Sequence, residues 1–301
     1  MTNWQSNHNF HTSVLLQEAV DGLKVTKGKW YVDCTLGAGG HTKEIVSRGG
    51  NVLAIDQDKE AIVEAKKQLP EDVQENVVFR KANFSKLADI VTEENVKPAG
   101  VLFDLGVSSY QLTGNKRGFS FQVEEPLDMR MDPETQTVTV RSLINGLYEK
   151  EIEKLISLYG EDPLAKGIAR AIVRARSLKP IETTVELAAI VGEVYKRAYR
   201  KPSKLNPATK TFQALRIAVN DEINALKDGL NAAVEVLQPG GRCVVISFHG
   251  LEDKTVKTTF TNWEQESKGI KITEKPVIPS VEEMEKNPRS RSAKLRIFEK
   301  K

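Results

Sequence analysis

Residues 33–41 have the sequence DCTLGAGGH, and they decide the fold. The run Trp30–Asp33 at their start predicts a β-strand, and the residues from about His41 onward predict a helix. The glycines between them let the backbone turn sharply and approach a ligand closely. The N-terminus of a helix offers unpaired N–H groups to an anionic group. This strand–turn–helix unit therefore predicts a nucleotide-type site at the carboxyl end of a parallel strand.

Two residues narrow the kind of cofactor. Asp56 ends the next predicted strand, where a carboxylate can accept hydrogen bonds from both hydroxyls of a ribose. Thr42 stands where the dinucleotide fingerprint G-x-G-x-x-G, counted from Gly37, requires its third glycine. A pyrophosphate needs the close helix approach that this glycine allows, whereas S-adenosylmethionine presents only an amino-acid carboxylate. The pattern favours S-adenosylmethionine and argues against a nicotinamide dehydrogenase.

Strands and helices alternate through the first third of the chain. Besides Trp30–Asp33, the predicted strands are Asn51–Asp56, Val77–Lys81 and Gly100–Asp104. Predicted helices lie between them at Lys59–Gln68 and Leu87–Glu94. This rhythm predicts an α/β fold with a doubly wound, mostly parallel sheet that carries helices on both faces.

The rhythm stops after Asp104, and a helical pattern replaces it. Helices are expected over Glu149–Tyr159, Pro163–Leu178 and Thr183–Tyr199, and one long helix over Pro207 to about Leu237. Strand character returns later, at Arg242–Ser247, Ile270–Pro276 and Leu295–Phe298, with a helix over Leu251–Glu266. We therefore predict three segments: a sheet domain in two pieces, 1–109 and 206–301, and a helical insert for RNA recognition, 110–205.

Basic residues gather in two parts of the chain. The whole chain has a formal net charge of +3, but Lys166–Arg216 alone carries +9 and Lys286–Lys301 carries +6. Such segregation is typical of a surface that binds a polyanion. The expected phosphate contacts are Arg170, Arg174, Lys196, Arg197, Arg200, Lys201, Lys204 and Lys210.

Composition excludes several classes of protein. The 301 residues are 40% hydrophobic, which is enough for a packed core and argues against a disordered chain. No signal peptide or membrane-length apolar run is visible, so a cytoplasmic protein without membrane contact is expected. Cys34 and Cys243 lie in strand-like runs, and no Cys/His or carboxylate cluster has ligand spacing, so no metal is expected.

Seven blocks of sequence resemble the RsmH (MraW) family, in the same order and over nearly the whole chain. They are residues 11–16 (HTSVLL), 37–41 (GAGGH), 104–109 (DLGVSS), 117–121 (RGFSF), 126–131 (PLDMRM), 207–216 (PATKTFQALR) and 246–249 (ISFH). The chain departs from the family pattern at Gly250, Asn206 and Gly167. The first departure removes a hydroxyl beside the last block, and the other two lie in the expected RNA-facing region.

The resemblance implies a class I (Rossmann-like) methyltransferase fold with a helical insert between the fourth and fifth strands. It implies transfer of a methyl group from S-adenosylmethionine to N4 of a cytosine in the decoding centre (P-site region) of 16S rRNA in the small ribosomal subunit. The cofactor contacts that carry over are Gly39, Gly40, His41, Asp56, Phe84, Asp104 and Gln111.

The catalytic assignment is a hypothesis built on the fourth strand. Many amino-methyltransferases carry an acidic or amide residue followed by two prolines after this strand, and here Asp104 takes that place without the prolines. We expect Asp104 to accept a hydrogen of the amine or to orient the amino group of the cofactor, with Ser108 or Ser109 assisting. His249 and Asp253, after the fifth strand, are second candidates for base recognition or proton removal.

Two alternatives remain open at this stage. The chain can be a methyltransferase for another RNA or for a small molecule, or a ribosome assembly or RNA-binding factor that keeps the methyltransferase fold without this catalytic specificity. The basic insert argues against a small substrate, and the intact glycine loop with Asp56 and Asp104 argues against loss of catalysis. The sequence does not indicate an oligomeric state.

Overall fold

A computed structural model of the chain describes residues 13–108, 110–111, 116–199 and 206–301. The chain divides into two compact units. The first unit comprises Met1–Gly106 and Lys227–Lys301, and the second comprises Val107–Leu226. Among the described residues, no helix combines the length and apolar character needed to cross a bilayer.

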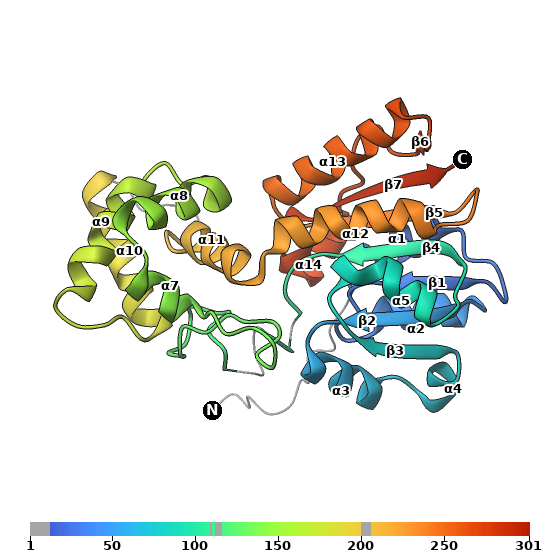
Figure 1. Ribbon diagram of the computed structural model, residues 1–301, viewed down its shortest axis with the longest axis horizontal. Helices are drawn as coiled ribbons and strands as arrows, with labels where there is room; N and C mark the ends of the chain where they lie inside the picture. The colour runs from blue at the N-terminus through green and yellow to red at the C-terminus, as the bar shows by residue number, and fades with distance from the viewer. Residues whose placement is uncertain (1–12, 109, 112–115, 200–205) are drawn as a thin grey trace. The chain divides into compact units, whose positions relative to one another are not determined.

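The first unit is built on a seven-stranded sheet with the order β3-β2-β1-β4-β5-β7-β6. Figure 1 shows its strands side by side. The strands are β1 (Trp30–Asp33), β2 (Asn51–Asp56), β3 (Val77–Lys81), β4 (Pro98–Asp104), β5 (Arg242–Ser247), β6 (Gly269–Lys271) and β7 (Lys294–Lys300). Strands β1 to β5 pair in parallel, and β7 pairs antiparallel with both β5 and β6. The structure confirms the predicted α/β fold with a doubly wound, mostly parallel sheet.

Alternate side chains of the strands build the two faces of this sheet. Leu102 of β4 belongs to a core cluster with residues of α1 (Leu16–Leu23), α2 (Gly40–Ser47) and α3 (Lys59–Gln68). The neighbouring Phe103 points the other way, toward Gly229 of α12 (Glu222–Val236) and Phe84 of the 3-10 helix η1 (Phe84–Lys86). Phe298 of β7 packs on the same side as Phe103, against α13 (Gly250–Gln265). The remaining short elements of the unit are α4 (Glu71–Gln74), α5 (Leu87–Glu93), α14 (Val281–Lys286) and η2 (Pro288–Ser292).

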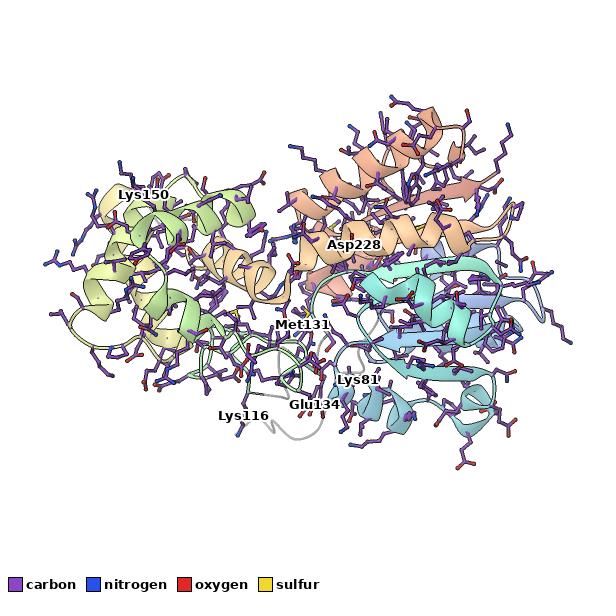
Figure 2. The ribbon with its side chains drawn as sticks, in the orientation of Figure 1. Lys81, Lys116, Met131, Glu134, Lys150 and Asp228 are labelled. Carbon is purple, nitrogen blue, oxygen red and sulfur yellow. The ribbon has the colours of Figure 1, made fainter. Side chains whose placement is uncertain are left out.

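The second unit is helical, as its sequence pattern predicts. Its helices are α7 (Val140–Gly146), α8 (Glu149–Gly160), α9 (Ala165–Arg176), α10 (Thr184–Ala198) and α11 (Thr209–Asn220). They share one apolar core, to which the loop before α7 adds Leu127, Met129 and Met131. Figure 2 labels Met131, which is buried in this core, and Lys150, which is exposed on α8. Thr183 caps α10, because its hydroxyl accepts the backbone N–H of Glu186.

The prediction of one long helix over Pro207–Leu237 is wrong. The chain breaks at Asp221, which has a left-handed φ of 49° and separates α11 from α12. The buried Asn220 side chain holds the end of α11 against the preceding loop: its Nδ2 donates to the Met129 carbonyl (2.8 Å) and its Oδ1 accepts the Met131 N–H (2.8 Å). Periodicity cannot show this break because both helices remain amphipathic on either side of it.

The predicted boundary at 205/206 also moves, to Leu226. Helix α11 packs on α8, where the absence of a side chain at Gly160 lets α8 approach the Lys210 carbonyl. The predicted strand Ile270–Pro276 is shorter as well. The continuous run of backbone hydrogen bonds to β7 ends at Ile272. The next donor, the Ile297 N–H, bonds to the Thr273 hydroxyl (3.0 Å) and not to a backbone carbonyl.

We predict that Asn220→Leu destabilises the second unit by about 2–4 kcal/mol, because it leaves a buried N–H and a buried carbonyl without partners. The measurement is hydrogen exchange of the Met131 amide and of the α11 amides. The control is Asn224→Ala, which removes an exposed side chain bonded only to Asp221 and is expected to change the opening free energy by less than about 0.5 kcal/mol. Equal protection in both variants would contradict the assigned role.

Candidate functional site

Three acidic residues end three neighbouring strands. Asp33, Asp56 and Asp104 are the last residues of β1, β2 and β4, which lie side by side as β2-β1-β4. From β1 the chain winds outward to β2 and β3 on one side, and β4 begins the other side. The carboxyl ends of β1 and β4 therefore form the switch point at which open α/β sheets bind ligands.

Asp33 organises the backbone around this point. Its Oδ2 accepts the Thr42 hydroxyl (2.7 Å) and its Oδ1 accepts the Thr35 N–H (3.2 Å). The Thr35 hydroxyl in turn accepts the backbone N–H of Asp104 (2.7 Å), which ties the loop after β1 to the end of β4. Burial raises the pKa of Asp33 to about 6 despite the bonds from Thr42 and Thr35, which lower it.

The glycine loop adopts a conformation that other residues resist. Gly37 and Gly39 have φ angles of 52° and 81°, in the left-handed region. A Cβ at Gly40, the first residue of α2, would collide with the Ser13 hydroxyl. Gly39, Gly40 and His41, three of the predicted cofactor contacts, therefore lie at the start of α2.

Asp56 holds the same loop from the neighbouring strand. Its Oδ2 accepts the Gly37 N–H (3.0 Å) and its Oδ1 accepts the Asp58 N–H (2.9 Å). Burial raises its pKa to about 6, while these two bonds act in the opposite direction. A carboxylate has about four lone-pair positions, so Asp56 retains acceptor capacity for two ribose hydroxyls.

Of the three acidic strand ends, Asp104 has the fewest hydrogen-bond partners among the described residues. Its Oδ2 lies 3.6 Å from Nδ1 of His41, whose Nε2 lies 3.2 Å from the Val14 carbonyl. Within the described part of the chain, its Oδ1 is buried and makes no hydrogen bond. Burial, Asp33 and Glu252 together hold the pKa of Asp104 well above its usual range. A buried, unpaired carboxylate oxygen at a strand end marks a position that a ligand donor can fill.

Phe84 supplies an aromatic surface beside β2. It begins η1 directly after β3, and Asn83 caps this turn by accepting the Ser85 N–H. Its ring meets Phe103 edge to face at a centroid distance of 5.5 Å, and a Cβ at Gly229 would lie 2.8 Å from the ring. Packing from both sides fixes the ring, which stays partly exposed.

The residues after β5 have structural partners. His249 caps α13, since its Nδ1 accepts the Glu252 N–H (3.3 Å), and its Nε2 lies 3.0 Å from Glu252 Oε1. Asp253 forms ion pairs with Lys294 (3.0 Å) and Arg296 (2.7 Å) of β7. His249 therefore caps the start of α13, and Asp253 holds this helix to β7.

Ser108 and Gln111 belong to the second unit, where they bond to each other. The Ser108 N–H donates to Gln111 Oε1 (3.0 Å) and the Gln111 N–H donates to the Ser108 hydroxyl (3.2 Å). This reciprocal pair forms one tight turn. Ser109 lies outside the described residues.

The acid-rich site fits S-adenosylmethionine. Its sulfonium and ammonium groups are cations that carboxylates stabilise, its ribose offers two hydroxyl donors to Asp56, and its adenine can lie against the Phe84 ring. The buried Oδ1 of Asp104 accepts a donor without displacing any bond it already has.

Sequence reasoning missed the residues that support this site. In the sequence, Thr42 was used only to exclude the dinucleotide fingerprint. In the structure, its hydroxyl donates a hydrogen bond to Asp33. Glu252 was overlooked, although it is buried and accepts the Phe248 N–H (2.7 Å) while its charge raises the pKa of Asp104.

We predict a pH-dependent stability difference between the wild-type protein and Asp33→Asn. The folded chain holds a proton on Asp33 up to about pH 6, whereas the unfolded chain releases it near pH 3.8, so wild-type stability falls as pH rises through this window. Relative to Asp33→Asn, the free energy of unfolding of the wild-type protein falls by about 3 kcal/mol between pH 3 and pH 7. Urea unfolding followed by tryptophan fluorescence measures it, since Trp30 and Trp263 both belong to the first unit. Parallel stability–pH curves would refute the shift.

Comparison with known proteins places the chain in a family. The model of the MraW methylase family matches residues 8–301. A protein of Paenibacillus sp. (strain JDR-2), named ribosomal RNA small subunit methyltransferase H, is 44% identical over 315 residues that cover 96% of this chain and 99% of the relative. A protein of the same name from Deinococcus deserti is 46% identical over 293 residues, covering 96% and 93%. A solved putative rRNA-methylase from Clostridium thermocellum aligns with a TM-score of 0.45 at 15% identity, over 97% of this chain and 100% of that one.

The matched residues include the glycine loop and all three acidic strand ends, and the relatives align over nearly their full length. The chain therefore belongs to the MraW methylase family.

Proposed function

We propose that the chain methylates N4 of a cytosine in the decoding centre, in its P-site region, of 16S rRNA. Family membership makes it an S-adenosylmethionine-dependent rRNA methyltransferase of the small subunit. The observation that supports an amine as the target is Asp104, whose buried Oδ1 has no hydrogen-bond partner among the described residues. An rRNA substrate also favours a cytoplasmic location.

The chemistry requires an acceptor beside the target nitrogen. The bound cofactor supplies an electrophilic methyl group. The exocyclic amine of cytosine is a weak nucleophile, because its lone pair is delocalised into the ring. A carboxylate that accepts one amine hydrogen localises the lone pair and later takes the proton that the methylated amine releases. Asp104 meets this need, since its buried Oδ1 has no hydrogen-bond partner among the described residues and can accept the amine hydrogen.

The target base must leave its stack to reach this carboxylate, at a cost of a few kcal/mol. In-line alignment of the amine with the methyl group offsets that cost, because alignment alone contributes on the order of 7–11 kcal/mol to rate acceleration. The network of Asp33, Thr35 and Asp104 keeps the acceptor fixed while the base arrives.

The second unit carries the basic residues expected to bind the rRNA backbone. Arg170 and Arg174 of α9, Lys196 and Arg197 of α10 and Lys210 of α11 are all exposed. Arg170 lies 3.8 Å from Glu149, an exposed pair that phosphate can replace at little cost. Arg200, Lys201 and Lys204 lie outside the described residues.

The product test is mass mapping of small-subunit rRNA after reaction with isotopically labelled S-adenosylmethionine. We expect the label on a single cytosine, at N4. Label on another base or atom would reject the proposed target. Binding to the subunit without any label would support a factor that keeps the fold without catalysis.

In the same assay, Asp104→Asn distinguishes the two roles of Asp104. If the carboxylate accepts the amine hydrogen, the single-turnover rate at saturating cofactor falls by about 100-fold or more. If it only orients the cofactor, affinity for the cofactor falls and the saturated rate stays near normal. Asp89→Asn, an exposed carboxylate on α5, serves as the control and keeps the wild-type rate.

A further inference from the structure

Two tyrosines lie one turn apart at the end of α10. The rings of Tyr195 and Tyr199 have centroids 5.8 Å apart and planes inclined by 39°. Tyr199 is 49% exposed. We call these two residues the tyrosine pair.

A buried acid anchors the inner member of the pair. The Tyr195 hydroxyl donates to Asp162 Oδ2 (2.8 Å), and Asp162 is only 4% exposed. The other oxygen of Asp162 accepts the Leu164 N–H (2.9 Å) at the start of α9. Burial and the bond to Asp162 raise the pKa of Tyr195, so its hydroxyl stays a donor at all physiological pH values. Tyr195 is therefore a rigid support on which the Tyr199 ring rests.

Basic residues lie between the two tyrosines in sequence and beside the Asp162 anchor. Lys196 and Arg197 are exposed on the turn between the two rings. Lys210 of α11 donates from its exposed Nζ to the Glu161 carbonyl (2.9 Å), next to the Asp162 anchor. The rings and these basic residues belong to the end of α10 and to α11.

We propose that the tyrosine pair is a stacking platform for an unpaired nucleobase of the substrate RNA. The inference rests on the proposed function and specifies how the second unit holds single-stranded RNA. A half-exposed ring on a fixed support presents a π-face to a base, and nearby Lys and Arg side chains meet the flanking phosphates. Charge decides the class of partner: the sequence Lys166–Arg216 carries a formal net charge of +9, which favours a polyanion over an apolar protein face.

The test compares Tyr199→Ala with Tyr199→Phe in the full-length protein. The probes are a fluorescent single-stranded oligocytidylate and an RNA hairpin of equal length, titrated by anisotropy. Stacking predicts that the alanine variant binds the single strand about tenfold more weakly, while the phenylalanine variant stays within about twofold of wild type. Hairpin binding is expected to be the same in all three proteins, because paired bases do not reach the ring.

Lys210→Gln provides the matched contrast. It removes one phosphate contact, so the slope of log K against log salt falls by about one unit on both probes. In Tyr199→Ala that slope is expected to stay at the wild-type value. Unchanged melting temperature and unchanged affinity for S-adenosylmethionine show that the variants remain folded.

Three results would overturn the platform. Wild-type affinity of Tyr199→Ala for the single strand would show that the Tyr199 ring does not bind a base. Equal losses in Tyr199→Phe and Tyr199→Ala would mean that the hydroxyl acts, not the ring. Loss of self-association with unchanged RNA binding would assign the pair to a second copy of the chain. None of these results depends on methylation, so product mapping on the wild-type protein tests the proposed function separately.

Discussion

The hydrogen bonds that Asp33 accepts hold the site together. A carboxylate that is 1% exposed loses most of its hydration, and the bonds from Thr42 and Thr35 replace it. Through Thr35 the same network fixes the end of β4, and Asp56 fixes the glycine loop from the other side. Removing this network would release the loop that starts α2 and the carboxylate expected to meet the substrate.

Burying these acidic groups lowers the stability of the free protein, and a cationic ligand can offset that loss. Three acidic groups lie at adjacent strand ends, and burial raises the pKa of each. Without a counter-charge the site favours protonated acids. We propose that a cationic methyl donor supplies that counter-charge, so that the features that destabilise the free protein above pH 6 strengthen cofactor binding. The same acids explain why a pyrophosphate would be a poor ligand here.

Local patterns predicted most of the sheet domain. The glycine loop, Asp56 and the strand–helix alternation are consecutive in sequence, so spacing alone identifies them. The break at Asp221 escaped prediction, because it depends on Asn220 bonding to Met129 and Met131, which lie some ninety residues earlier. Two further contacts were not predicted for the same reason, because only folding brings their partners together. They are the bond of Thr42 to Asp33 and the bond of the tyrosine pair to Asp162. The roles of Ser108, Gln111 and His249 in the reaction stay predictions.

Proton release on cofactor binding tests the acidic site most directly. Calorimetric titration of S-adenosylmethionine at pH 6, in two buffers with different ionisation enthalpies, counts the protons exchanged. With Asp33 and Asp56 half-protonated at this pH, we predict release of about one proton per bound cofactor, and none at pH 8. Proton uptake, or no exchange at pH 6, would mean that these carboxylates do not face the positive charge of the donor.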